Sequence, residues 1–436
     1  MSEGAPLRLR VGALRPLLRT SFWGLADQTL ISITNLATML ILARNLGSSE
    51  FGAFVLAYTA LLFLNGIQVA LVTQPHNVLG QNRPVGDYVR YTSSTALGQV
   101  VLSATLSAGA LAGALAATSF SARAVAILLA LAPAIAAWQL QEFVRRVLYT
   151  EGRLETAFAI DLVSYGGQVG ALLTLVSRTE IGAPSALYVV GATSAVGAAL
   201  GGWKIRHSLG RRADAAGLRE NWIFGRWLAA ALAASWLAGQ LYIYLTAAMR
   251  GATAAGGLKA AQIVLGPLNT FLLFLFTILP IGYARTRSRT GEAGLHRALM
   301  LTYAATAPFV LVYCLAVAIL AKPILRLLYG ATYSRYGTVV VLFSLYYFVL
   351  HPVYLLTSVL NAKRQTRPLF MGNLYAAVLG VAAGWLLIRA WGVNGAVAGM
   401  IAGTLVLVAV FWHSYRVSPR ATAERPQPEV APLPPG

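Results

Sequence analysis

Charged residues are scarce in this chain, and acidic residues are the scarcest of them. Only 11% of the 436 residues are charged, with 34 Lys and Arg against 14 Asp and Glu. Soluble globular proteins average about 25% charged residues. A soluble fold of this length could not cover its surface with so few polar side chains, and 57% of the residues are hydrophobic. The composition therefore predicts a polytopic membrane protein.

Several kinds of site are missing as well. The single cysteine, Cys314, excludes an intrachain disulfide. The chain has no G-x-x-x-x-G-K-[ST] loop for a nucleotide, and no H-E-x-x-H sequence or cysteine cluster for a metal. We therefore expect no enzymatic activity, no cofactor and no metal site. The first apolar run is longer than the apolar core of a signal peptide, about 7–15 residues, so it is expected to be retained as a membrane span.

Twelve apolar segments are long enough to cross a bilayer, which takes about 20 residues as a helix. Because they do not alternate with period two, they predict helices rather than the strands of a barrel. Pro267 and Pro280 predict a bend within the eighth segment. The predicted spans are 20–44, 51–72, 91–117, 122–148, 154–177 and 181–203, followed by 225–248, 254–283, 297–321, 338–361, 367–389 and 392–415.

A polar interval near the middle divides the apolar segments into two sets of six. It runs from Trp203 to Arg226 and carries six cations against Asp214 and Glu220. We interpret it as a linker between two lobes that leaves them free to move. The predicted organisation is a basic cytoplasmic segment 1–19, an N-lobe 20–203, a basic cytoplasmic linker 204–224, a C-lobe 225–415 and a disordered cytoplasmic tail 416–436.

The positive residues indicate the orientation. With twelve spans, 25 of the 34 cations fall on the side that holds both termini and the linker. Cytoplasmic loops carry the excess of Lys and Arg in membrane proteins, so both termini are predicted to be cytoplasmic. A nucleic-acid partner is not expected, because the cations flank apolar segments and form no patch with interleaved aromatic residues.

The two lobes share a weak repeat. The sequence ARNLGSSEFGAF at 43–54 corresponds to AAMRGATAAGGL at 247–258, which aligns Gly47 with Gly251 and Gly52 with Gly256. Because six spans is an even number, both lobes begin on the same side of the membrane. The repeat is then parallel, with a pseudo-twofold axis along the membrane normal.

Two carboxylates lie deep within predicted spans. Asp27 and Asp161 are each about 10 Å from the cytoplasmic end of a span, at 1.5 Å per residue. Ionisable groups at such depth usually face a protein interior or a wet cavity. They are candidates for coupling transport to H⁺ or Na⁺. The alternative is a structural contact, for example with Gln28, Gln168 or a tyrosine.

Three cations near the outer ends of spans form a second candidate group. Arg44, Arg250 and Lys259 would surround a positive lumen suited to phosphate if they face inward. The alternative for Arg44 and Arg250 is that they extend to the outer head groups. Lys259 lies further inside, so the lumen is favoured for it. Further polar residues are candidates for lining a cavity or contacting sugars: Gln28, Gln68, Tyr242, Gln262, Asn269 and His351, the last of which is more often a hydrogen-bonded core residue.

Three stretches resemble a known family. They are ILARNLGSSEFGAFVLAYTALLFL (41–64), RRVLYTEGRLETAFAIDLV (145–163) and WGVNGAVAGMIAGTLV (391–406). They resemble Wzx-type oligosaccharide flippases of the multidrug/oligosaccharidyl-lipid/polysaccharide superfamily. The resemblance implies a MATE-like fold of two six-helix lobes around a central cavity, in a bacterial inner membrane.

The resemblance also implies a function. Such proteins move undecaprenyl-pyrophosphate-linked oligosaccharide from the cytoplasmic to the periplasmic leaflet by alternating access, often with ion coupling. The product would enter O-antigen (lipopolysaccharide), capsule or exopolysaccharide synthesis, with polysaccharide polymerase and glycosyltransferases as partners. Related lipid II flippases have basic residues on spans one, two and eight. Lys259 matches the last, span two has no basic residue, and two C-terminal spans of those flippases are lacking, which argues against lipid II.

Two other functions were weighed against this one. Drug exporters of the same superfamily also resemble the chain, and some carry a coupling carboxylate on span one, where Asp27 lies. A cation-coupled multidrug antiporter is therefore the alternative. A membrane glycosyltransferase would need an outward acidic pair, and only Glu50 and Glu180 are candidates on that side.

Overall fold

The computed structural model describes residues 6–81, 83–178, 181–210, 212–363 and 365–417, and every regular element within these ranges is a helix. The predicted all-helical membrane fold is confirmed. The predicted tail 416–436 lies outside the described residues except for its first two. Residues 1–5 of the predicted N-terminal segment lie outside the described residues. From Pro6 onward the segment is continuous with the first span, in one helix from Pro6 to Asn45.

The first half of the chain contains six spans. Two of them pass through a single turn of π-helix, at Val69–Thr73 and Leu162–Gly166, and continue as α-helix beyond it. Such turns open the regular hydrogen-bond ladder and often lie at functional sites. The helices are α1 (Pro6–Asn45), α2 (Ser48–Gln68) with α3 (Gln74–Leu79), α4 (Val85–Ala117), α5 (Ala122–Thr150), α6 (Leu154–Asp161) with α7 (Gly167–Arg178), and α8 (Ala183–Ile205).

Seven α-helices lie in the second half. They are α9 (Ala215–Arg250), α10 (Ala252–Val264), α11 (Gly266–Ile319), α12 (Ala321–Tyr329), α13 (Gly337–Ala362), α14 (Thr366–Trp391) and α15 (Val393–Val417). The bend predicted in the eighth span is confirmed, since α10 and the start of α11 meet at 60°. Helix α11 itself turns at Gly291, whose φ of 68° lies in the left-handed region that favours glycine. Its two parts correspond to the end of the eighth span and to the ninth.

In the described part of the chain, ten helices are long and apolar enough to cross a membrane, and eleven if the bent pair counts as one span. Helix α9 accounts for the twelfth predicted segment. It is 36 residues long, which is sufficient to cross a bilayer.

The polar linker is shorter and more ordered than predicted. Helix α9 begins ten residues early, at Ala215, because the side chain of Asp214 accepts a hydrogen bond from the backbone N–H of Gly217 at 2.9 Å. This bond lowers the pKa of Asp214. The backbone N–H groups of Gly210 and Asp214 also donate to Ser93 and Ser94 of α4, at 2.7 and 2.8 Å. The polar linker therefore packs against α4. We call the end of the helix bundle at which the linker packs the linker end.

At the opposite end, the two halves meet where α2 crosses α10. A Cβ atom on Gly52 would lie 1.8 Å from the carbonyl oxygen of Ala252, and one on Gly256 would lie 3.0 Å from Cα of Gly52. Only glycine permits helices to approach so closely. The two glycines that the repeat aligns therefore contact each other across the interface. We call this end the glycine end.

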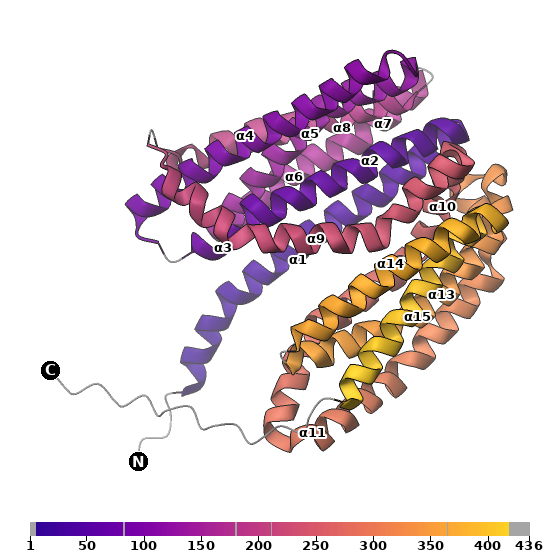
Figure 1. Ribbon diagram of the computed structural model, residues 1–436. Helices are drawn as coiled ribbons and strands as arrows, with labels where there is room; N and C mark the ends of the chain where they lie inside the picture. Colours follow the sequence, from indigo (N-terminus) through magenta and orange to yellow (C-terminus); the bar gives the residue numbers. More distant parts are fainter. Residues whose placement is uncertain (1–5, 82, 179–180, 211, 364, 418–436) are drawn as a thin grey trace.

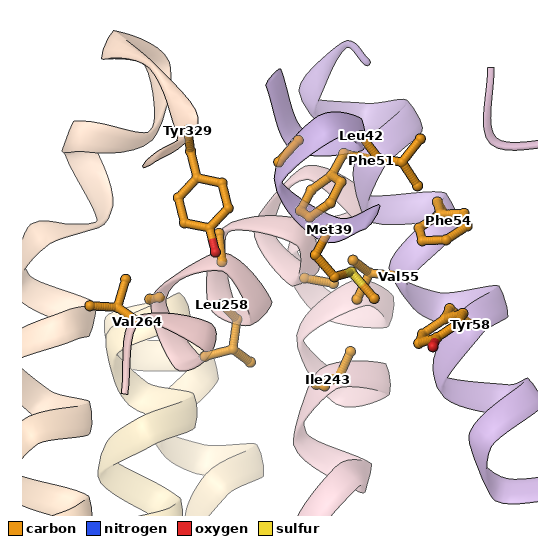
Figure 2. Packing of buried hydrophobic residues seen from close by; sticks show 14 of the residues in the cluster. Met39, Leu42, Phe51, Phe54, Val55, Tyr58, Ile243, Leu258, Val264 and Tyr329 are labelled. Carbon is orange, nitrogen blue, oxygen red and sulfur yellow. The ribbon is translucent and has the colours of Figure 1, made fainter. Parts of the chain in front are cut away.

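Apolar side chains from both halves pack around this crossing. Figure 2 shows Phe51, Phe54 and Val55 of α2 close to Met39 and Leu42 of α1, with Leu258 of α10 and Ile243 of α9 nearby. These residues belong to one buried cluster that continues into α12 and α13. The burial of this cluster holds the glycine end of the two halves together.

Helix α9 joins the two halves. In Figure 1, helices α2 to α8 form one group, α11 and α13 to α15 form the other, and α9 runs between them. Near its start, Asn221 bonds Tyr91 and Thr95 of α4 at 2.6 and 3.1 Å. Near its end, Tyr242 packs on the glycines of α14 and α15. The two groups diverge toward the linker end (Figure 1).

Candidate functional site

Asp27 and Asp161, the two predicted coupling residues, lie on either side of one arginine. The guanidinium of Arg145 is 3.7 Å from a carboxylate oxygen of Asp27 and 3.4 Å from one of Asp161. It also pairs with Glu142 one turn earlier on α5. All four side chains are at most 9% exposed. We call these residues, together with Arg146, the carboxylate cluster.

Local sequence explains how the cluster forms. Glu142, Arg145 and Arg146 follow one another at helical spacing on α5, so their side chains share one face. Arg146 donates to Glu142 at 2.8 Å. Asp161 is the last residue of α6 before the π-turn, and Asp27 reaches the cluster from α1. Three separate spans therefore supply the three carboxylates.

The carboxylates are only partly satisfied by neutral groups. Tyr149 donates to Asp27, and Gln141 donates to Asp161 at 3.0 Å. The other oxygen of Asp27 is buried and has no hydrogen-bond partner in the described part of the chain. With all groups ionised, three carboxylates face two guanidinium groups, which leaves one net negative charge. A buried site with an excess negative charge and a free acceptor oxygen is suited to binding a proton.

The polar residues predicted to line a cavity in the first half are arranged differently. Gln28, next to Asp27, is exposed on α1. Gln68 is fully buried and donates to Gln99 at 2.9 Å and to the backbone oxygen of Gln139 at 2.6 Å. Its amide is therefore used to hold α2, α4 and α5 together.

Lys259, the cation for which the sequence favoured the lumen, lies half-buried on α10. Its ammonium group donates to Gln262 of the next turn at 3.0 Å, so two of the predicted residues form one pair. Glu292 is the only acidic residue between Asn221 and Val417. Glu292 lies at the linker end, where it pairs with Arg287 and Lys363 at 2.7 Å each. The charge of Lys259 therefore has no carboxylate partner in the second half.

Arg44 and Arg250 do not join Lys259. Arg44 donates to the backbone oxygen of Leu328 at 2.7 Å and also to that of Leu327, at the end of α12. Arg250 donates to the oxygens of Ile388 and Arg389 at the end of α14, at 2.9 and 2.6 Å. The last carbonyls of a helix lack intrahelical partners and attract a cation. Both arginines therefore cap the C-terminal ends of helices at the glycine end. The predicted positive lumen surrounded by Arg44, Arg250 and Lys259 is not formed.

His351 and Asn269 complete the predicted set. His351 is fully buried on α13, bonds the hydroxyl of Thr306 at 2.8 Å and stacks on Tyr303, as a core histidine does. Asn269 is half-buried just after the bend of the eighth span. Within the described residues, neither forms a hydrogen bond with Lys259.

The sequence analysis did not predict two features. It did not connect Arg145 with Asp27 and Asp161, because the packing of α5 on α1 and α6 brings these side chains together. It also missed a cavity of about 400 Å³ within the second half, lined by Tyr242 and by tyrosines of α13. The spacing Tyr346, Leu350, Tyr354 places these on one helical face and would have indicated it.

No family model matches the chain, and no curated protein sequence matches it. Similarity to solved structures is extensive. An inward-facing multidrug resistance MATE family transporter of the MOP superfamily superimposes with a TM-score of 0.73 and 12% identity, over 89% of this chain and 94% of that one. The lipid II flippase MurJ in an inward closed conformation gives 0.71 and 14%, over 91% and 87%.

An outward-facing structure described as a multidrug resistance MATE family transporter of the same superfamily is also similar. It gives a TM-score of 0.60 and 13% identity, over 92% of this chain and 94% of that one. The chain therefore shares the fold of these transporters.

Proposed function

We propose that this protein is a flippase that moves undecaprenyl-pyrophosphate-linked oligosaccharide across the bacterial inner membrane for surface polysaccharide synthesis. Lys259 is the observation that carries the proposal. It is a half-buried cation with an amide neighbour and no carboxylate partner in the second half of the chain. An unneutralised ammonium group within the bilayer is suited to a phosphate group.

The conformation fits the loading of such a substrate. The distribution of cations predicts that the linker end faces the cytoplasm. The halves are in close contact at the glycine end and diverge toward the linker end (Figure 1). In this proposal, the lipid-linked sugar enters from the cytoplasmic leaflet with its prenyl chain in lipid, and separation of α2 from α10 then releases it outward. Glycosyltransferases would act before this step, and polysaccharide polymerase would act after it.

The proposal is tested by deleting the gene from its host. Lipid-linked oligosaccharide should then accumulate on the cytoplasmic face, and surface polysaccharide should be lost. Restoration by the plasmid-borne full chain controls for effects on neighbouring genes. Normal surface polysaccharide without a trapped intermediate would exclude this function.

Lys259→Ala should reduce binding of undecaprenyl pyrophosphate about 10- to 100-fold, because a hydrogen bond to a charged group contributes about 1.5–3 kcal/mol. Lys259→Arg, which keeps the charge, should retain most of the binding. Binding is measured on purified full-length protein by native mass spectrometry. Lys322→Ala, an exposed lysine on α12, is the matched control. Equal binding by wild type and Lys259→Ala would remove Lys259 from the substrate site.

Asp27→Asn should remove the dependence of transport on an ion gradient, because the amide has almost the same shape but cannot exchange a proton or attract a cation. Transport is followed in proteoliposomes with H⁺ or Na⁺ gradients imposed in turn. Asp87→Asn is the control, since Asp87 is an exposed carboxylate that pairs with Arg90 at the linker end. A variant that still responds to the gradient would show that the carboxylate cluster has a structural role.

The carboxylate cluster also favours a second candidate, a cation-coupled multidrug antiporter, since buried carboxylates suit the exchange of H⁺ or Na⁺ for an organic cation. The two functions differ in the expected effect of Lys259→Ala. Removing the positive charge should weaken transport of a pyrophosphate lipid and should improve or leave unchanged the export of a cationic dye such as ethidium.

A further inference from the structure

We propose that the cavity in the second half of the chain binds the neutral sugar part of the carried lipid. The inference rests on the proposed function and deepens it, because it separates recognition of the glycan from recognition of the pyrophosphate by Lys259. Five helices bound the cavity, which has a volume of about 400 Å³. Small-molecule sites commonly have volumes of about 300–1,000 Å³.

The lining residues determine which class of ligand fits. None of them is charged. A phosphate, a metal ion or an organic cation would therefore enter this cavity without a counter-charge, at a high desolvation cost. The lining instead combines aromatic rings with hydroxyl and amide groups, from Tyr242, Phe276, Tyr346, Tyr354, Asn373 and Thr404. Sugars match this combination, because their rings stack on aromatic faces while their hydroxyls need hydrogen bonds.

The cavity offers both donors and acceptors. The hydroxyls of Tyr242 and Tyr354, which line the cavity, form no hydrogen bond with the residues that the structure describes, so their donor hydrogens are available. Thr357 and Thr404 donate to the backbone oxygens of Val353 and Met400 at 2.7 and 2.8 Å. Their own oxygens are thereby oriented as acceptors.

Asn373 adds a further acceptor. Its amide nitrogen donates to the backbone oxygen of Leu369 at 2.7 Å, which leaves the side-chain oxygen as an acceptor. A sugar hydroxyl donates one hydrogen bond and accepts others, so it can be satisfied by a tyrosine and a threonine or asparagine together. A polar hydroxyl without any partner inside the membrane would be costly, which favours an occupant that supplies these bonds.

Tyr242 is held in a fixed position. Its ring lies on a ridge of glycines from α14 and α15: a Cβ atom on Gly384 would be 2.4 Å from the ring, and one on Gly380 would be 2.8 Å from the hydroxyl oxygen. Because these glycines have no side chain, the ring of Tyr242 packs directly against the helix backbone. Such preorganisation lowers the entropy cost of binding.

The first half of the chain provides an internal comparison. Its buried polar residues are mostly satisfied by one another, as in the chain of hydrogen bonds from Gln68 through Gln99 and Ser103 to Gln139. In the second half the corresponding polar groups surround open space. The two halves share a repeat, but in the second half the polar groups surround an open cavity. This difference assigns glycan recognition to the second half.

The test compares two lipids on purified full-length protein by native mass spectrometry. One is undecaprenyl pyrophosphate, and the other is the same lipid with the oligosaccharide extracted from the host envelope. Wild type should bind the glycosylated lipid at least tenfold more tightly. The double variant Tyr242→Phe and Tyr354→Phe keeps both rings and should bring the two affinities close together without changing that for the bare lipid. Tyr375→Phe, an exposed tyrosine on α14, is the control.

The outcomes separate the two proposals. If wild type binds neither lipid, the proposed function fails. If wild type binds both lipids equally, or if the double variant keeps the tenfold preference, the cavity does not bind the sugar, and the proposed function stands. A melting temperature of the double variant near that of wild type shows that the loss of preference is not caused by unfolding.

Discussion

Replacing Arg145 with alanine should lower the unfolding free energy by about 3–5 kcal/mol, the usual effect of leaving a buried charge without its partner. The guanidinium of Arg145 faces Asp27, Glu142 and Asp161 within one buried site. Without it, three carboxylates would remain with only Arg146, and they would repel one another in a medium that hydrates them poorly. Thermal unfolding of the detergent-purified protein measures the change.

Two variants make this prediction specific. Arg146→Ala should have a smaller effect, because Arg146 is 27% exposed and bonds only Glu142 among the acids. The double variant Arg145→Ala with Asp161→Asn should recover part of the loss, since it restores the original net charge of the cluster. If Arg145→Ala unfolds at the same temperature as wild type, the arginine does not hold these carboxylates.

The sequence identified the members of this cluster better than it identified their arrangement. The depth of Asp27 and Asp161 within apolar segments showed that both must face the protein interior. It did not show that they share a partner, because the positions of α1 and α6 beside α5 are set by tertiary packing. Arg145 lies one turn from Glu142 on α5, and this spacing indicates a contact within the helix but none with the other two acids. Only the packing of three spans shows that this arginine is their common partner.

The arrangement of Arg44, Arg250 and Lys259 differs from the predicted one, for a reason that the sequence does not contain. Arg44 and Arg250 lie near the ends of the first and seventh predicted spans, and a sequence shows their depth but not the helix ends beside them. In the structure, carbonyls in the last turns of α12 and α14 accept their hydrogen bonds. Lys259 has only a glutamine beside it. Which cation stays free for a ligand is thus decided by neighbouring backbone, which the sequence pattern does not contain.

The fold was more predictable than the site. All twelve predicted segments are helical, because long apolar runs in a membrane have no other way to satisfy their backbone groups. The bend near Pro267 followed from proline chemistry. The start of α9 was placed too late, because the prediction treated polarity as the end of a helix. In fact Asp214 supplies an N-cap, and the polar turns that follow pack on α4.

Gly52→Leu should shift the protein away from the state that is closed at the glycine end. Even a Cβ atom at this position would lie 1.8 Å from the carbonyl oxygen of Ala252, so α2 and α10 cannot keep their present separation. Overpacking costs about 1–3 kcal/mol. A penalty of this size that acts only on the closed state changes the ratio of the two states about 5- to 150-fold. Transport should fall, because alternating access requires both states.

The shift is measured as the distance between spin labels at Phe120→Cys and Thr332→Cys, one in each half, in a Cys314→Ser background. Both positions are exposed. Gly52→Leu should deplete the shorter distance and populate a longer one. Gly47→Leu is the matched control, because no atom lies within 4 Å of its Cβ position and its φ of −57° suits any residue.

Gly256, the partner of Gly52 in the repeat, provides a second test of the same contact. A Cβ atom on Gly256 would meet Cα of Gly52 at 3.0 Å, so Gly256→Leu should open the glycine end in the same direction. Because both substitutions disrupt one contact, the double variant should shift the label distance no further than Gly52→Leu alone. An additive shift, or an unchanged distance in either single variant, would mean that this crossing does not control the closed state. A shared, non-additive effect would show that the two aligned glycines form a single contact between the halves.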